Sequence, residues 1–432
     1  MDPGSRPSLA DPAPAGERRC LPRPRRVGDL RPTDLVSAFF VCAIAFLLAA
    51  AAAGVLQALS PWPWGRWLAL HLAFVGGVSQ LVLGASQFFV GAFLATDPPP
   101  RALVRGQLLA WNTGAVVLAI AMPMAAGAAV WGAVALLLAG LALWGAAVAT
   151  MSRRSLRRSV WATNWYASAA AFLGLGVLVG SLLAHGTPWA HGNLLAAHLA
   201  LNLGGWFGAA IVGTLHTFFP SLTQTRLRYP RLQPLCFVAW TGGVSALAVG
   251  YAWTLEPLAL AGWFGLCLGA LMLLINIGAC LGTAPRPLPL PARLVGAGQP
   301  FLLAGLGVAT VAALDRGPGL ALVGPPRAAV GTLLVVGWIG LTVVGSLLHL
   351  LAVVVRVRAG FTARMPDPRP RLDLSLTAVA ATGIALLALS QRAGLDTWRQ
   401  PGELLLLLSY SYFAARITLL AGRLLARARP SL

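Results

Sequence analysis

The sequence predicts an all-α fold, a polytopic membrane bundle of about twelve transmembrane helices, from three observations. Of the 432 residues, 58% are hydrophobic and only 10% are charged. Apolar stretches of about twenty residues, the length that a helix needs to cross a bilayer, recur from end to end. The 32 basic residues are all arginine and gather in alternate loops, while the 12 acidic residues fall in loops, tails or span ends.

The chain divides into a short tail, one membrane domain and a second short tail. Residues 1–33 are rich in proline and arginine and are expected to form a disordered cytoplasmic tail. Residues 34–424 form the twelve-helix domain, and residues 425–432 form a cytoplasmic tail. The first apolar run is long and begins near Leu35, so no cleavable signal peptide is predicted. The expected spans are residues 35–59, 67–95, 107–126, 128–150, 160–183, 193–220, 235–255, 257–283, 296–314, 328–355, 373–391 and 402–422.

The arginines predict the orientation of the bundle. With both termini in the cytoplasm, 26 arginines lie in cytoplasmic segments, 5 lie in outer loops, and Arg416 falls within the last span. This is the positive-inside rule, so the formal charge of +20 is a topology signal and predicts no nucleic-acid partner. The absence of lysine beside abundant alanine, glycine and arginine favours a bacterial source. We expect a multi-pass protein of the bacterial plasma (inner) membrane.

Ionisable side chains inside the spans are the candidate functional residues, because they are costly to bury in lipid. His71 and His198 lie at matching depth near the outer ends of the second and sixth spans. His216 and His349 lie at matching depth near the inner ends of the sixth and tenth spans. Two imidazoles at one depth on neighbouring helices could hold one haem between them. Alternatively, each imidazole is a buried group hydrogen-bonded to a backbone carbonyl or an amide.

Other features narrow the possible chemistry. No carboxylate lies near the middle of a span, which disfavours a cation-coupled carrier. The five cysteines form no CxxC pair, so neither a disulfide nor a thiolate metal site is expected. His185 and His191 lie in the outer loop before the sixth span, where they form either a copper entry site or a solvated surface.

Two spans resemble each other. The sixth contains Gly205-Trp206-Phe207-Gly208 followed by Gly213, and the tenth contains Gly337-Trp338-Ile339-Gly340 followed by Gly345, at the same offsets. A shorter echo lies at residues 262–265. The repetition predicts duplicated helix modules.

The run from His198 to Pro220 resembles a helix in the catalytic subunits of C-type haem–copper oxidases and nitric-oxide reductases. That helix follows the pattern HxHxxxxGW, six residues, Gly, six residues, Pro, and the matching residues are His198, Gly205, Trp206, Gly213 and Pro220. Twelve spans, an internal N-terminus and His71 on the second span also resemble that family. The chain is similar, too, to membrane modules associated with bacterial copper oxidases.

The departures from this pattern matter for function. The second histidine of the family pattern is Ala200 here, and no His-His pair or HPxxY-like copper motif is present. The resemblance therefore implies a degenerate member that does not by itself reduce oxygen or nitric oxide. It leaves His71 and His198 as the candidate haem or copper ligands, although the family would not pair these two positions on one haem.

The leading hypothesis is a degenerate haem–copper-oxidase-like membrane protein that binds haem or copper. His71 and His198 are the metal ligands, His216 and His349 are further cofactor ligands, and no catalytic residue is identified. Its role would be electron transfer, sensing or cofactor handling, with the lipid bilayer and a copper oxidase or another redox protein as partners. The alternatives are a permease for a small neutral or anionic solute and a membrane scaffold for a copper oxidase.

Overall fold

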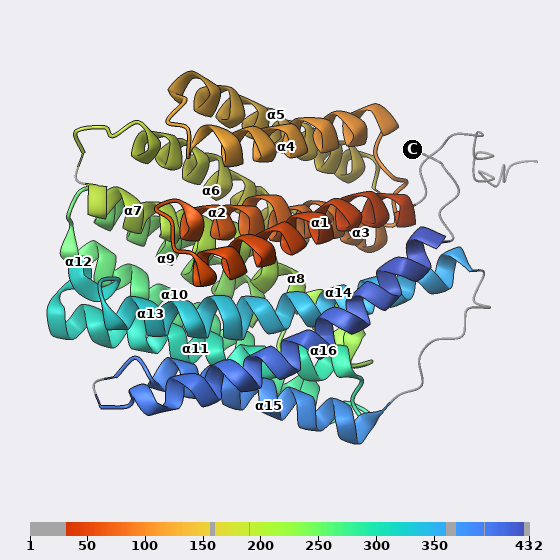
Figure 1. Ribbon diagram of the computed structural model, residues 1–432. Coiled ribbons are helices and arrows are strands. Elements are labelled where there is room, and N and C mark those ends of the chain that lie inside the picture. The colour runs from red at the N-terminus through yellow and green to blue at the C-terminus, as the bar shows by residue number, and fades with distance from the viewer. Residues whose placement is uncertain (1–31, 156–159, 190, 360–368, 393, 427–432) are drawn as a thin grey trace, which may run out of the picture.

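The computed structural model is helical over the residues that it describes, which are 32–155, 160–189, 191–359, 369–392 and 394–426. It contains no strand in these ranges. Twelve of its helices are long and apolar enough to cross a membrane, so the prediction of an all-α bundle with twelve spans is confirmed (Figure 1). Apart from a few residues that join the first and last helices, the expected tails at 1–33 and 425–432 lie outside the described residues.

Nine spans are each built around one α-helix and three are built from consecutive segments. We number the spans 1–12 in chain order. Span 1 is α1 (Pro32–Leu59), and span 2 comprises α2 (Gly65–His71), η1 (Leu72–Val78) and α3 (Ser79–Leu94). Spans 3 to 5 are α4 (Arg101–Ala121), α5 (Gly127–Arg154) and α6 (Val160–Ala184), and span 6 comprises α7 (His191–Leu199), η2 (Ala200–Gly208) and α8 (Ala209–Leu222). Spans 7 to 9 are α9 (Leu232–Ala252), α10 (Glu256–Thr283) and α11 (Leu290–Arg316), followed by the short helix α12 (Pro318–Ala321). Span 10 comprises α13 (Pro325–Gly331), η3 (Thr332–Gly340) and α14 (Leu341–Arg358). Span 11 is α15 (Pro370–Leu389), and span 12 is α16 (Arg399–Ala426) after the turn η4 (Asp396–Trp398).

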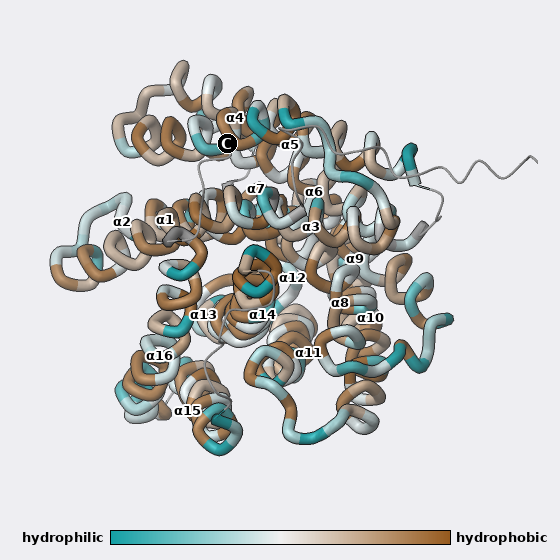
Figure 2. The backbone as a smooth tube through the Cα atoms, turned by 90° about the vertical axis from the view of Figure 1, so that its right-hand side faces the viewer, coloured by the Kyte–Doolittle hydropathy of each residue, from teal (hydrophilic) through white to brown (hydrophobic). Residues whose placement is uncertain are grey.

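The first and last helices begin and end on the same side of the bundle. The start of α1 and the end of α16 lie together at the right of Figure 1, and Figure 2 looks onto this side, with the helices seen end-on. Arg358 at the end of α14 donates a 2.8 Å hydrogen bond to Asp34 near the start of α1. Because Arg153, Arg154 and Arg358 end their helices here, we call this side the Arg-rich end and the opposite side the Arg-poor end.

Two spans start six residues earlier than the apolar pattern predicts, and both have proline near their start. The third span, expected at 107–126, is α4 at Arg101–Ala121. It follows Pro100 and ends before Pro123, whose nitrogen has no hydrogen to continue the helical hydrogen bonds. The ninth span, expected at 296–314, is α11 at Leu290–Arg316. Pro291 lies in its first turn, where the missing N–H has no helical partner to lose.

Spans 2, 6 and 10 differ from the others because each contains a π-helical segment, η1, η2 or η3. In a π-helix the hydrogen bonds join residues five apart, so each turn holds an extra residue, and such segments are frequent at functional sites. Hydropathy does not distinguish this conformation from an α-helix, and the sequence did not predict it. Each segment contains at least two glycines, such as Gly76 and Gly77 in η1.

Glycines of the three π-bearing spans pack against the preceding span in a repeated pattern. At one level, the glycines and the phenylalanines they meet are Gly76 with Phe46, Gly205 with Phe172, and Gly337 with Phe301. At the second level, nearer the Arg-rich end, the pairs are Gly84 with Phe39, Gly213 with Trp165, and Gly345 with Val295 and the adjacent Leu294. Any side chain at these glycines would overlap its partner, so glycine sets how closely the two spans approach.

A backbone carbonyl of each π-helical segment accepts a hydrogen bond from an aromatic side chain. The donors and acceptors are Trp111 Nε1 to Val75 at 2.9 Å, Trp240 Nε1 to Gly204 at 2.9 Å, and Tyr410 Oη to Val336 at 2.7 Å. Both tryptophans follow their acceptor by 36 residues. A π-helical turn leaves carbonyls without an ordinary partner, and a buried donor satisfies them.

The recurrence of these contacts divides the bundle into three four-helix repeats, spans 1–4, 5–8 and 9–12. The similarity between spans 6 and 10 that the sequence predicts is found at equivalent structural positions, and span 2 is a third copy without the tryptophan. The third repeat differs in one respect. The side chain that donates to its π-segment carbonyl lies on span 12, whereas the corresponding donors of the first two repeats lie on spans 3 and 7. The echo at 262–265 has a different role: it lies in α10, where Gly262 packs on Gly243 of α9.

Candidate functional site

His71 is the last residue of α2, immediately before the π-helical segment of span 2. Its Nδ1–H donates a 2.9 Å hydrogen bond to the carbonyl of Trp67, and its ring stacks on the Trp67 indole with the centroids 4.0 Å apart. Since a carbonyl only accepts, Nδ1 carries the proton and Nε2 presents its lone pair. Nε2 has no hydrogen-bond partner among the described residues.

His198 lies about two turns into span 6 and faces α6. Its Nδ1 is 3.0 Å from the carbonyl oxygen of Gly176 and 3.3 Å from the amide nitrogen of Asn202. The carbonyl can only accept and makes the shorter contact, so Nδ1 carries the proton and donates to it. The Asn202 amide donates to the backbone carbonyl of His198 at 2.8 Å. Gly176 and Gly180 make room for these two side chains, because a Cβ on Gly180 would lie 2.9 Å from Cε1 of the imidazole. His198 therefore also has a protonated Nδ1 and, within the described residues, an Nε2 without a hydrogen-bond partner.

His71 and His198 lie on spans that pack against each other. Spans 2 and 6 touch through Phe74 and Phe207, with ring centroids 5.1 Å apart, and through Trp206 Nε1, which donates to Ser79 Oγ at 2.9 Å. Both histidines precede these contacts in their spans, on the side of the Arg-poor end, and both carry the proton on Nδ1.

His216 faces α6 as His198 does, but it is more deeply buried, with 2% of the residue exposed. Its Nδ1–H donates to the carbonyl of Val212 at 2.8 Å, and its ring is nearly parallel to Trp165, with the centroids 6.1 Å apart. Its Nε2 is a buried acceptor without a partner, and Trp165 Nε1 is a buried donor without one in the described structure.

His349 and His216 are not brought together. The His349 ring contacts Phe218 edge-on, with the centroids 5.6 Å apart. Phe218 and His216 are two residues apart on α8, about 200° around the helix, so they point in nearly opposite directions. The pairing of these two histidines on one cofactor, which their matching depth predicts, therefore does not occur. The reason is the direction of His216, which turns toward span 5 and away from span 10.

Of the two outer-loop histidines, the structure describes the side chain of His185. His185 stacks on Trp131, with the ring centroids 4.7 Å apart. Both of its nitrogens lie near backbone carbonyls, Nδ1 at 2.8 Å from Ser181 and Nε2 at 3.3 Å from Gly127. Both ring nitrogens of His185 therefore face backbone carbonyls, and a neutral ring can donate to one of the two. His191 begins α7, and its side chain lies outside the described residues.

The donor set at His71 and His198 fits a metal ion. Metal-bound histidines usually donate one ring N–H to a carbonyl or carboxylate and bind the metal through the other nitrogen, and both histidines have this arrangement. In the described part of the chain, no three His, Cys, Asp or Glu side chains gather where they could hold a metal. A metal bound here would have the two imidazole nitrogens as its protein ligands, as a bis-histidine haem or a two-coordinate Cu(I) ion does.

Sequence reasoning located the two histidines but missed the groups that orient them. Trp67 is one turn before His71, and Gly176 and Gly180 are four residues apart on α6. The small-xxx-small spacing of the glycines was a usable signal for close approach of a neighbouring side chain. No protein-family model matches this sequence, and no curated protein sequence matches it either.

Proposed function

We propose that this integral membrane protein binds haem or copper through Nε2 of His71 and Nε2 of His198, and that it acts in electron transfer, sensing or cofactor handling. The single observation that carries the proposal is the matched state of the two imidazoles. Each donates Nδ1–H to a backbone carbonyl, and each leaves Nε2 without a described partner.

The energetic argument is that an idle imidazole nitrogen in this position is costly. Neither Nε2 is enclosed by protein as Nε2 of His216 is. Both lie within membrane spans, where lipid offers no hydrogen bond, and a polar atom left without one there costs on the order of 1–3 kcal/mol relative to a satisfied one. In both histidines, Nδ1 donates to a backbone carbonyl, and Nε2 has no hydrogen-bond partner among the described residues. A ligand bound to both Nε2 atoms removes that cost.

The residues around the pair would orient the imidazoles. Trp67 stacks on one face of the His71 ring, and the carbonyl of Gly176 fixes the His198 ring in the cleft above Gly180. A bound haem or copper ion would supply one-electron redox chemistry at this point. The surrounding apolar side chains would exclude water and lower the local dielectric, which changes the reduction potential.

The resemblance to haem–copper oxidases supports the same proposal through one residue of the metal pair. His198 opens the matching run to Pro220, and its position in the family pattern is a haem ligand position. We extend the proposal to a copper oxidase or another redox protein as electron partner, in a bacterial inner membrane with both termini in the cytoplasm.

The experiment is purification in mild detergent from cells supplied with iron, haem precursor and copper. We expect an absorption band of haem, or stoichiometric copper by elemental analysis, and near-complete loss of either in the His71→Ala and His198→Ala proteins. The matched control is His185→Ala, which removes a histidine near the same end of the bundle whose ring nitrogens both face backbone carbonyls. It should keep the cofactor.

A colourless protein that is free of iron and copper under these conditions would refute the proposal. So would a cofactor that persists when both His71 and His198 are replaced. The permease and scaffold hypotheses make different predictions for the same preparation. A permease should move solute in liposomes without any cofactor, and a scaffold should co-purify with an oxidase whether or not the histidines are present.

A further inference from the structure

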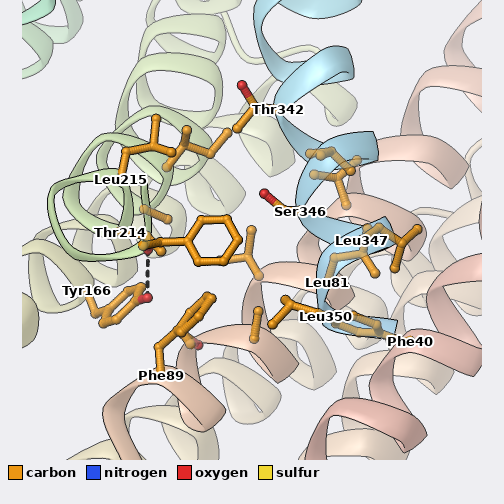
Figure 3. A pocket seen from close by; sticks show the side chains of 18 residues that line it. Phe40, Leu81, Phe89, Tyr166, Thr214, Leu215, Thr342, Ser346, Leu347 and Leu350 are labelled. Carbon is orange, nitrogen blue, oxygen red and sulfur yellow. Dashed lines mark hydrogen bonds between the residues drawn. The ribbon is translucent and has the colours of Figure 1, made fainter. Parts of the chain in front are cut away.

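We propose that a cavity on the axis between spans 2, 6 and 10 is a binding site for one small, neutral, mainly apolar molecule of a few non-hydrogen atoms. The cavity has a volume of about 80 Å³ and lies among spans 1, 2, 5, 6 and 10 (Figure 3). None of its lining residues is a histidine or carries a charge. The inference is independent of the proposed metal site.

The three π-bearing spans contribute to the cavity at equivalent positions of the repeat. Counted from Gly84, Gly213 and Gly345, the next residue in each span is Ala85, Thr214 or Ser346. These three small side chains form one level of the wall, which we call the belt. Contacts between spans 2 and 6 on both sides of the belt support this equivalence. Toward the Arg-poor end, Trp206 donates a hydrogen bond to Ser79, and toward the Arg-rich end, the rings of Phe218 and Phe89 have centroids 5.2 Å apart.

Large side chains narrow the cavity above and below the belt, although protein does not enclose it completely. Four residues further toward the Arg-rich end, the equivalent positions are Phe89, Phe218 and Leu350. Three residues toward the Arg-poor end, they are Val82, Ile211 and Val343. The space therefore exists because three small residues meet at one level between two levels of bulky ones.

The belt also supplies hydrogen-bonding groups. The Ser346 hydroxyl points from α14 toward the cavity and has no hydrogen bond to any described residue (Figure 3). Thr214 Oγ1 is 2.7 Å from the hydroxyl of Tyr166, so the two share one hydrogen and leave the other without a described acceptor. A ligand here meets one or two hydroxyl donors. The hydroxyls of Ser86 and Thr342, which also line the cavity, already have hydrogen-bond partners, and the remaining lining residues are apolar.

Size and chemistry define the class of ligand. A volume of about 80 Å³ lies between the roughly 30 Å³ that a water molecule occupies in the liquid and the roughly 150 Å³ of an apolar cavity that binds benzene. Ions are disfavoured because the wall offers no charge to replace their hydration. Apolar cavities of this kind stay dry and take up apolar probes such as xenon. Such molecules also dissolve in lipid and can reach the bundle from the membrane.

Xenon is the probe for the test. In crystals of the full chain equilibrated under xenon pressure, we expect one xenon site at the level of Thr214 and Ser346. Ala85→Leu should remove it, because the added atoms enter the cavity from the third side of the belt. The matched control is Ala139→Leu on the exposed face of α5, which should retain the site. In solution, xenon should raise the unfolding temperature of the wild-type and control proteins more than that of the Ala85→Leu protein.

Three results would overturn the proposal. They are an empty axis in the wild-type crystal under xenon, a xenon site that survives in Ala85→Leu, and ordered water at the belt that xenon does not displace. Should Ala85→Leu fail to fold, Ser346→Leu fills the same level from α14 and serves instead. Helical circular dichroism and a monodisperse elution profile establish that the variant in use is folded.

Discussion

At the scale of single residues, the surroundings of His198 decide what its imidazole can do. The ring lies over Gly180, and its Nδ1 reaches across to the carbonyl of Gly176 on the neighbouring helix. Both positions require glycine because side chains of span 6 occupy the space where a Cβ would lie. The Asn202 amide fills the space beside Gly176, and the His198 imidazole fills the space beside Gly180. The direction of Nε2 therefore depends on residues of span 5 that hold no ligand themselves.

This arrangement predicts that Gly180→Ala weakens cofactor binding without removing a ligand. The added Cβ would lie 2.9 Å from Cε1 of His198, so the ring must tilt away from the Gly176 carbonyl. We expect metal affinity to fall about 10–100-fold, the usual effect of losing an orienting partner, as measured by titration of the apo-protein. Gly174→Ala on the same helix meets only ordinary contact with Leu141 at 3.8 Å and should bind as the wild type does. Equal binding by both variants would contradict the orienting role of Gly176.

The histidines also illustrate what sequence reasoning can and cannot reach at this scale. The depths of His71, His198, His216 and His349 follow from counting residues along spans, and His198 and His216 do share a helix face, since both turn toward α6. The direction of one helix relative to its neighbours is set by packing, which no count supplies. His216 consequently stacks on Trp165, and its expected partner His349 lies against Phe218 on the other side of α8.

At the scale of helices, the π-helical segments depend on donors from other spans. Hydropathy predicted the twelve spans because apolar length alone decides whether a helix crosses lipid. It could not predict η1, η2 and η3, since a π-helical turn and an α-helical turn use the same apolar residues. The capping hydrogen bonds from Trp111, Trp240 and Tyr410 link residues 36 or 74 positions apart, and only the folded arrangement brings them together.

The repeat predicts that Trp111→Phe and Trp240→Phe destabilise the protein to a similar extent. Each removes an indole N–H that is 2.9 Å from a π-segment carbonyl and keeps most of the aromatic packing. Leaving such a carbonyl without a donor should cost about 1–3 kcal/mol, measured as the change in unfolding free energy in detergent. Trp398→Phe, at a side chain that is 46% exposed, is the control and should change stability by no more than about 0.5 kcal/mol. A neutral effect of both core substitutions would show that the carbonyls find other partners.

At the scale of the whole molecule, the arginine distribution and the helix arrangement agree with each other. An even number of spans places the start of α1 and the end of α16 on one side, which is also where the arginines that end α5 and α14 lie (Figure 1). The ion pair between Arg358 and Asp34 joins the first and third repeats at this side. The positive-inside rule then predicts that this side faces the cytoplasm.

Reporter fusions test the orientation. A fluorescent protein joined after Leu432 should be bright, and a phosphatase inserted in the loop at Thr187 should be active, because that loop lies at the Arg-poor end. The same phosphatase inserted after Arg154 should be inactive. The reverse pattern at all three sites would place the arginines outside and invert the predicted topology.

Because the fold repeats three times, equivalent positions in the repeats show which residues the fold tolerates at one site. At the level of the axial cavity, the scaffold accepts Ala85, Thr214 and Ser346 in one role, and opposite the deeper glycines it accepts Phe39, Trp165 and Leu294. A residue found at a position in one repeat is therefore a candidate substitution at the equivalent positions of the other two repeats. Ala85→Thr would complete a ring of three hydroxyls using a residue that the same fold already tolerates at the same depth.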